Sequence, residues 1–310
     1  MILLTGSANA ALARDVAQRL GTPLAACVLE RFPDGELHVE LRESVRGQKV
    51  FLLQSTSPPV EANIFELLFL ADACRRAGAR QRIAVMPYFG YARQDRRAVG
   101  REPIGARVVS DILVAGGIDA VVVLDLHSHA AEGFFSVPAE HLSAVSLLAE
   151  AIKADAGESP VLVAPDLGAV RLADRYSRLL RLPVATIHKT RLSGQDVKVQ
   201  QIVGDVRDRT PIIVDDMIST GGTVAAAVRA LLAAGCRPDV TVAATHGLFA
   251  GRAADVLRDL PIDRFITTDS VAPQEDLGLP VRIVSVAPLL ASVIKRLDKE
   301  ASLGSLASRG

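Results

Sequence analysis

The sequence has few aromatic residues and no excess of either charge. Aromatic residues make up 4% of the 310 residues, and tryptophan is absent. This scarcity argues against the aromatic platforms on which bases of single-stranded nucleic acids stack. The 35 lysines and arginines balance the 35 aspartates and glutamates. No basic excess therefore indicates nucleic acid or an anionic membrane surface as a partner.

Cysteines are also few, and long apolar runs are absent. Cys27, Cys74 and Cys236 are widely spaced in apolar surroundings, without a CxxC or metal-binding spacing. This pattern predicts buried free thiols in a reducing compartment. No apolar run approaches the roughly 18 residues of a membrane span, and residues 1–6 lack the charged start of a signal peptide. We therefore expect a cytoplasmic protein without membrane contact.

The residues that are present indicate an α/β protein. Apolar residues make up 49% of the chain, and short β-rich runs alternate with longer helical patterns. That alternation predicts mainly parallel sheets with helices on both faces. Strands are expected at 2–5, 24–28, 37–41, 49–54, 82–87, 120–125, 160–164, 183–188, 211–214, 239–245, 263–267 and 282–285. Helices are expected at 8–20, 61–79, 104–115, 143–154, 168–180, 223–234, 251–258 and 287–298.

About twelve strands are too many for one compact open sheet, so we expect two domains. A loop near residues 138–142 separates two strand–helix series. We place the N-terminal domain at 1–141, joined by the C-terminal helix 287–298. The second domain covers 142–286, and the tail 299–310 is expected to be loose.

The most informative stretch runs from Pro211 to Val224. An apolar strand leads to Asp215 and Asp216, and a glycine-rich turn leads to a helix. Glycines and a helix N-terminus suit an anion, whereas two carboxylates suit sugar hydroxyls or a hard cation. One loop would then hold a ribose 5-phosphate at both ends. The anion-binding part of the loop comprises Ser219, Thr220, Gly221, Gly222 and Thr223.

An ordinary capped turn would also explain a lone TGGT. The Asp pair directly after the strand favours the functional interpretation. The stretch also resembles the loop of the phosphoribosyltransferase fold that binds 5-phosphoribosyl-1-diphosphate (PRPP). This loop does not separate enzymes that make PRPP from enzymes that consume it.

Other polar residues follow predicted strands, where ligands of open parallel sheets bind. His127 and Asp166 could hold a divalent cation together, although each alone is more often a capping or hydrogen-bonding group. Lys189 and Arg191 precede a glycine-containing segment, 192–201, that we expect to be a mobile lid over phosphates. A solvated sheet edge is the plainer alternative for these two cations.

Two further stretches carry candidate residues. Arg93 and Gln94 lie in a run rich in arginine that follows a predicted strand and could bind an anion. The Pro-Asp-Gly sequence alone explains a turn at residues 31–36. It does not explain Phe32, a large apolar side chain that we expect to pack against another group.

Together these stretches resemble the ribose-phosphate pyrophosphokinase (PRPP synthetase) family over roughly residues 1–298. The matching motifs are RFPDGE (31–36), ESVRGQKVFLLQST (43–56), PYFGYARQDRR (87–97), LDLHSH (124–129), GFFSVP (133–138), PDLGA (165–169), HKTR (188–191), VDDMISTGGT (214–223) and ATHGLF (244–249). The resemblance implies two phosphoribosyltransferase-type domains, Mg²⁺ as cofactor, ATP and ribose 5-phosphate as substrates, and assembly into dimers and hexamers.

The resemblance also implies a role for each matching residue. ATP would be bound by Phe32, Asp34, Glu36, Arg93 and Gln94, with the first three reaching the adenine from a neighbouring subunit. Metal ligands would be His127 and Asp166, and the catalytic cations Lys189 and Arg191. Asp215 and Asp216 would contact the ribose hydroxyls, and residues 219–223 the 5-phosphate.

The chain departs from the common family pattern at several positions. Ser219 replaces the usual Asp, Gly221 the usual Ala, and Ala169 the second glycine of PDxGG, while HKTR replaces the common DKRR. Loss of the Asp at position 219 removes a negative charge beside the ribose and puts the usual regulation by phosphate and ADP in doubt. The predicted reaction is transfer of the β,γ-diphosphoryl group of ATP to the C1 hydroxyl of ribose 5-phosphate. The alternatives are a silent PRPP- or nucleotide-binding regulator and a PRPP-consuming phosphoribosyltransferase.

Overall fold

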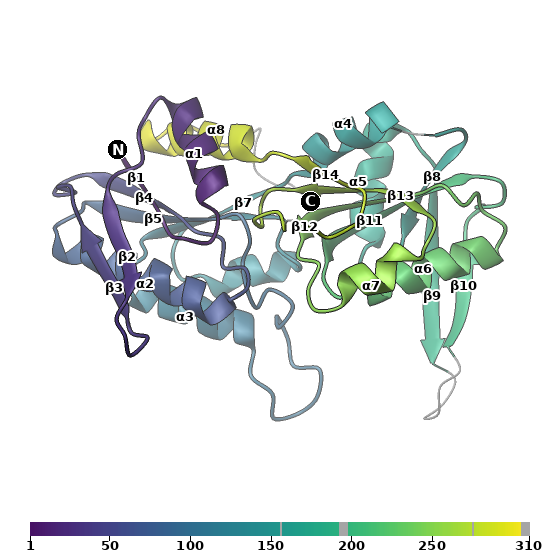
Figure 1. Cartoon of the computed structure of the whole chain (residues 1–310), viewed down its shortest axis with the longest axis horizontal. Coiled ribbons are helices and arrows are strands. Elements are labelled where there is room, and N and C mark those ends of the chain that lie inside the picture. The colour runs from purple at the N-terminus through teal and green to yellow at the C-terminus, as the bar shows by residue number, and fades with distance from the viewer. Residues whose placement is uncertain (156, 192–197, 275, 305–310) are drawn as a thin grey trace. The chain divides into compact units, whose positions relative to one another are not determined.

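The structure is a computed structural model that describes residues 1–155, 157–191, 198–274 and 276–304 (Figure 1). It divides the chain into two compact units. The N-terminal unit comprises residues 1–143, 270–272 and 285–310, and the C-terminal unit comprises 144–269 and 273–284. Both units contain mainly parallel sheets flanked by helices, as the sequence predicted.

The N-terminal unit contains a five-stranded parallel sheet in the order β1-β4-β5-β6-β7 and a separate antiparallel hairpin, β2–β3. Its strands are β1 (Ile2–Thr5), β2 (Cys27–Arg31), β3 (Leu37–Leu41), β4 (Lys49–Leu53), β5 (Gln81–Met86), β6 (Ala120–Leu124) and β7 (Ala139–Leu142). Its helices are α1 (Ala10–Leu20), α2 (Val60–Arg76), α3 (Gly105–Ala115), the 3-10 turn η1 (His129–Phe134) and α8 (Ala287–Asp298).

Helices cover both faces of this sheet. Leu67 and Leu70 of α2, with Val109 and Leu113 of α3, pack against alternate strand residues in one core. On the other face α1 packs against α8 (Figure 1). The last helix of the chain is therefore part of the N-terminal unit.

The C-terminal unit contains a seven-stranded sheet in the order β10-β9-β8-β11-β12-β13-β14, parallel except for β10. Its strands are β8 (Pro160–Ala164), β9 (Val184–Arg191), β10 (Lys198–Val203), β11 (Thr210–Ile218), β12 (Val240–Gly247), β13 (Ile262–Thr268) and β14 (Val281–Val284). Its helices are α4 (Val145–Asp155), α5 (Val170–Leu180), α6 (Gly222–Ala233) and α7 (Ala253–Arg258). In Figure 1, α4 and α5 lie on one face of the sheet, and α6 and α7 lie on the other.

Several sequence expectations were wrong. The segment 138–142 is not a loop, because β7 pairs with β6 there. The predicted lid 192–201 contains the start of β10, which pairs antiparallel with β9; residues 192–197 lie outside the described residues. The strand predicted at 211–214 continues to Ile218 because its ladder with β12 extends to Gly247. No helix in the described ranges is both long and apolar enough to cross a membrane.

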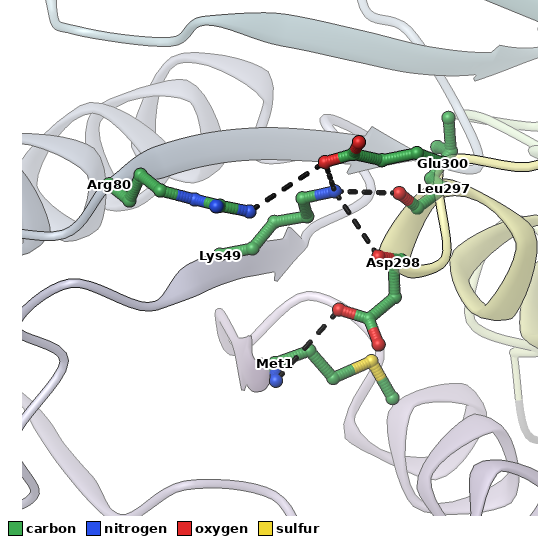
Figure 2. Close-up of polar contacts among 6 residues, drawn as sticks. All are labelled: Met1, Lys49, Arg80, Leu297, Asp298 and Glu300. Carbon is green, nitrogen blue, oxygen red and sulfur yellow. Dashed lines mark hydrogen bonds and ion pairs between the residues drawn. The ribbon is translucent and has the colours of Figure 1, made fainter.

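A buried lysine holds the end of α8 to the N-terminal sheet. The Lys49 side chain, at the start of β4, is only 6% exposed. Its Nζ donates to the carbonyl of Leu297 at 2.8 Å and to that of Asp298 at 3.4 Å. Figure 2 shows Lys49 between the helix end and Glu300, whose carboxylate also pairs with Arg80. The Leu297 carbonyl also accepts from Glu300 N at 3.2 Å. Lys49 thus adds a charged donor at the C-terminus of α8, where positive charge is favourable.

Replacing Lys49 by methionine keeps an apolar stem and removes this donor. We expect the free energy of unfolding to fall by about 1–3 kcal/mol, because two carbonyls lose a buried, charged partner. Urea and thermal unfolding measure the change. The matched control is Arg80→Met, which removes only an exposed pair with Glu300 worth about 0–1 kcal/mol. Equal effects of the two substitutions would contradict the assignment.

Candidate functional site

The phosphate-loop prediction falls on a strand–loop–helix unit in the C-terminal sheet. Strand β11 is central, pairing in parallel with β8 and β12. Residues 219–221 connect it to α6, whose N-cap residue is Gly221. Gly221 has a φ of 77°, which favours glycine, and an added Cβ would lie 2.9 Å from the Leu257 side chain. The glycine therefore permits both the turn and its close packing on α7.

The loop is held in place through its carbonyl groups. The carbonyl of Ile218 accepts hydrogen bonds from Leu248 N at 2.9 Å and Phe249 N at 3.0 Å, and that of Ser219 accepts from Ala250 N at 2.9 Å. The first N–H groups of α6 have no acceptor one turn earlier in the helix. Thr220 and Thr223 are exposed beside them. The loop thus offers N–H and hydroxyl donors, which is the chemistry of an anion site.

Two carboxylates precede the loop within β11. Asp215 and Asp216 are both half-buried, and Asp216 N donates to Asp215 Oδ1 at 2.9 Å. Burial raises the pKa of Asp215 well above its ordinary value, the negative charge of Asp216 raises it further, and Asp166 adds a smaller effect. The site therefore concentrates negative charge that a cation or hydrogen-bonding ligand would relieve.

Asp166 lies at the same edge of the sheet, because it follows β8, the strand beside β11. Its Oδ1 accepts hydrogen bonds from Gly168 N at 2.9 Å and Ala169 N at 3.3 Å, just before α5 begins. These bonds orient the carboxylate. Within the described residues, no three His, Cys, Asp or Glu side chains are grouped so that they could hold a metal ion. A metal here would need water or substrate oxygens as further ligands.

The sequence suggested that Lys189 and Arg191 follow a strand. Instead they lie within β9, which continues to Arg191. Their backbone pairs with β10, where Lys189 faces Gln200 and Arg191 faces Lys198. The side chains of residues 189–191 lie outside the described part of the chain.

The remaining predicted residues belong to the N-terminal unit. His127 is exposed and follows β6 through Asp125, whose φ is 37°. Leu126 N donates to Nε2 of the buried His141 at 3.0 Å. No motif or spacing in the sequence marks His141 or this contact.

Phe32, Asp34 and Glu36 lie together in the exposed turn of the β2–β3 hairpin. The turn is closed by Phe32 N donating to the Glu36 carbonyl at 2.9 Å and by Glu36 N donating to Asp34 Oδ1 at 3.1 Å. The Phe32 side chain is 47% exposed, and its ring lies 5.2 Å from that of His38. An exposed ring on a hairpin tip is suited to contact a planar group.

Arg93 and Gln94 are exposed in the loop after β5. The loop is tied to the start of α3, because the Gln94 carbonyl accepts from Ala106 N at 3.2 Å. The structure thus places all five predicted ATP residues in the N-terminal unit, on two separate loops.

The raised pKa of Asp215 predicts that the stability of the folded protein depends on pH. The folded protein holds a proton on Asp215 more tightly than the unfolded chain does, so protonated Asp215 contributes to stability at low pH. This contribution is lost as pH rises from the pKa of Asp in the unfolded chain, about 3.9, through the raised pKa of the folded protein. Asp215→Asn should therefore raise Tm at about pH 8, and the gain should vanish near pH 4. Differential scanning calorimetry measures both. The control Asp263→Asn removes an exposed carboxylate from β13; a gain of equal size there, or none at Asp215, would contradict the assignment.

Two family models match the chain. One, the N-terminal domain of ribose phosphate pyrophosphokinase, matches residues 1–117, and the other, the phosphoribosyl transferase domain, matches residues 137–274.

Full-length relatives give the same result. A ribose-phosphate pyrophosphokinase of Gloeobacter violaceus is 40% identical over 306 residues, covering 98% of this chain and 92% of that protein. That of Streptomyces avermitilis is 40% identical over 310 residues, covering 99% and 95%. The crystal structure of phosphoribosylpyrophosphate synthetase from Mycobacterium smegmatis is 39% identical, with a TM-score of 0.91, and covers 97% of this chain and 99% of that chain. The chain therefore belongs to the ribose-phosphate pyrophosphokinase family and is built from two phosphoribosyltransferase-type domains.

Proposed function

We propose that the protein is a ribose-phosphate diphosphokinase. It transfers the β,γ-diphosphoryl group of ATP to the C1 hydroxyl of ribose 5-phosphate, which gives PRPP and AMP. The observation that carries the proposal is identity near 40% with ribose-phosphate pyrophosphokinases over essentially the whole chain. The anion loop and acidic pair of β11 supply the matching chemistry.

The sugar phosphate is held by β11 and its loop. The 5-phosphate accepts hydrogen bonds from the N–H groups at the start of α6 and from the hydroxyls of Ser219, Thr220 and Thr223. The ribose hydroxyls bond to Asp215 and Asp216. With its raised pKa, Asp215 can donate a hydrogen bond to a sugar oxygen when protonated and accept one from a sugar hydroxyl when ionised.

The donor set of the site fits Mg²⁺. The charges of Asp166 and Asp216 both act on Asp215, and Mg²⁺ prefers one or two carboxylates completed by water and substrate phosphates. We assign Asp166 and His127 as its protein ligands, although histidine is a less usual choice for this ion. When bound, Mg²⁺ neutralises phosphate charge and lowers the pKa of a coordinated hydroxyl.

The N-terminal unit supplies the nucleotide contacts. Arg93 provides a bidentate phosphate donor and Gln94 an amide hydrogen-bonding group. The exposed ring of Phe32 provides a stacking face, and Asp34 and Glu36 on the same hairpin tip provide acceptors for adenine or ribose groups. We propose that this tip reaches a nucleotide bound to a neighbouring subunit.

Lys189 and Arg191 serve as electrostatic catalysts. The reaction moves charge onto the transferred group and the departing AMP oxygen, and cations positioned there stabilise the transition state. The rest of catalysis is positioning of the C1 hydroxyl in line with the β-phosphorus.

The decisive assay measures AMP and PRPP formed from ATP, Mg²⁺ and ribose 5-phosphate. We expect equal amounts of both products, and no product after chelation of Mg²⁺. Lys189→Ala should cut turnover by about 10²-fold, the scale of losing one electrostatic stabiliser, while ribose 5-phosphate binding stays largely intact. Wild-type turnover in that variant would contradict the catalytic assignment.

The same assay separates the alternatives. A PRPP-consuming transferase would instead release diphosphate from PRPP and a nucleobase. A silent regulator would bind PRPP or nucleotide without turnover. Ser219 in place of the family's Asp leaves this alternative open, whereas the presence of His127, Asp166, Lys189 and Arg191 counts against it. Varying phosphate and ADP tests whether the usual regulation persists.

We also propose that the protein self-associates through an apolar surface of the N-terminal unit, here called the α2–α3 patch. It comprises Phe65, Phe69, Val108 and Ile112, which are 54%, 42%, 52% and 38% exposed. The two phenylalanines contact each other edge to face, and Phe69 and Ile112 line one hollow of about 620 Å³. Exposed apolar patches of this kind are typical of subunit interfaces.

Replacing both Phe65 and Phe69 by serine should convert a dimer or hexamer into smaller species, because the patch loses its largest apolar groups. Light scattering after gel filtration gives the mass. Val203→Ser is the control, because Val203 is similarly exposed, at 53%, on β10 in the other unit. A monomeric wild type, or an unchanged mass for the double variant, would refute the interface.

We propose a cytoplasmic location. All three cysteines are free thiols, and burial raises the pKa of Cys74 to about 12 and that of Cys236 to about 11. Such thiols are poorly reactive, which suits a reducing compartment. The zero net charge gives no support for a nucleic-acid or membrane partner.

A further inference from the structure

A buried histidine holds the turn that carries His127. The ladder between β6 and β7 continues as far as Asp125 N, which donates to the Leu142 carbonyl at 3.0 Å. The next amide, Leu126 N, meets the imidazole Nε2 of His141 at the same distance. Leu126 and His141 are 7% and 4% exposed, so water is a poor substitute for this acceptor.

The hydrogen bond defines the state of the ring. An imidazole nitrogen that accepts from an N–H group carries no proton, so the proton of neutral His141 resides on Nδ1. Nδ1 lies 3.7 Å from Glu132 Oε2 on η1. The His129 ring packs against the same imidazole, with centroids 4.8 Å apart. Glu132 and His129 thus both lie close to the imidazole of His141.

We infer that His141 is a positioning residue for His127. Asp125 has a φ of 37°, so the chain leaves β6 in a conformation that few side chains favour. The bonds of Asp125 N and Leu126 N to β7 hold this backbone on both sides of the bend. Because His127 is the next residue, its direction depends on the His141 acceptor. The inference rests on the proposed role of His127 as a metal ligand.

The simpler alternative is that His141 only fills space between β7 and η1. Two variants separate the possibilities. His141→Leu has similar bulk and no acceptor, whereas His141→Gln places an amide oxygen at about the reach of Nε2. His129→Leu is the matched control, because His129 contacts the same ring but does not accept from Leu126.

The first measurement is amide hydrogen exchange in the segment 121–132. We expect faster exchange at Leu126 in His141→Leu, and exchange near the wild-type rate in His141→Gln and His129→Leu. A second measurement needs no variant: ¹⁵N NMR of histidine-labelled wild-type protein should show His141 with its proton on Nδ1. A proton on Nε2 would overturn the inference, even if the leucine variant does not fold.

The third measurement is the Mg²⁺ concentration for half-maximal PRPP synthesis. Loss of a group that orients a metal ligand typically costs 10–100-fold in metal affinity or activity. We expect at least a roughly 10-fold increase for His141→Leu, rescue by His141→Gln, and a KM for ribose 5-phosphate within about 2-fold of wild type. A glutamine variant as impaired as the leucine variant, or unchanged exchange in the latter, would overturn the inference. If the wild type makes no PRPP, the proposed function fails, while exchange and NMR still decide whether His141 holds the turn.

Discussion

The site depends on like charges gathered at one edge of the C-terminal sheet. Adjacent parallel strands end at the same edge, so Asp166 after β8 and the Asp pair of β11 come together without any helix or long loop to place them. The raised pKa of Asp215 reflects this crowding. A globular protein gains no stability from such an arrangement. A ligand that brings hydroxyl donors or a divalent cation relieves the repulsion between these carboxylates, and this relief contributes to the free energy of binding.

The loop of residues 219–221, beside this edge, presents hydrogen-bond donors where the edge presents negative charge. The carbonyls of Ile218 and Ser219 face the segment 248–250 and are occupied there. The adjoining N–H groups at the start of α6 belong to the part of a helix that lacks internal acceptors. Donors and acceptors are thus separated along a few residues of backbone, with negative charge before the loop and donors within it. This separation matches a sugar phosphate, which has hydroxyls at one end and an anion at the other.

Much of this site could be predicted because it is local in sequence. Strand, carboxylates, glycines and helix follow one another between Pro211 and Val224, and each step has its own chemical signal. The end of β11 was predicted too early, because aspartate disfavours strands. The partner strand β12 overrides that preference by continuing the ladder to Gly247.

The features that the sequence did not predict depend on partners distant in the chain or on short polar strands. β10 is half polar and was interpreted as part of a lid, yet it pairs with β9 over six positions. β7 is only four residues long, at the edge of its sheet. The acceptor on His141 serves an amide 15 residues earlier, and a ring nitrogen that bonds to backbone leaves no periodic pattern. Single histidines of this kind are recognised only once both partners are placed.

The path of the chain adds a constraint on folding. The N-terminal unit is discontinuous, since α8 returns from the far end of the sequence to pack on α1. Lys49 and the carbonyl of Leu297 are 248 residues apart, and their hydrogen bond closes that loop. Loop closure costs only about (3/2)RT ln n in free energy, so the contact is tolerable thermodynamically. It is costly in time, because folding slows as contacts become less local. One face of the first sheet therefore stays incompletely covered until the last helix has been made, and the buried charge of Lys49 lacks its partners until then.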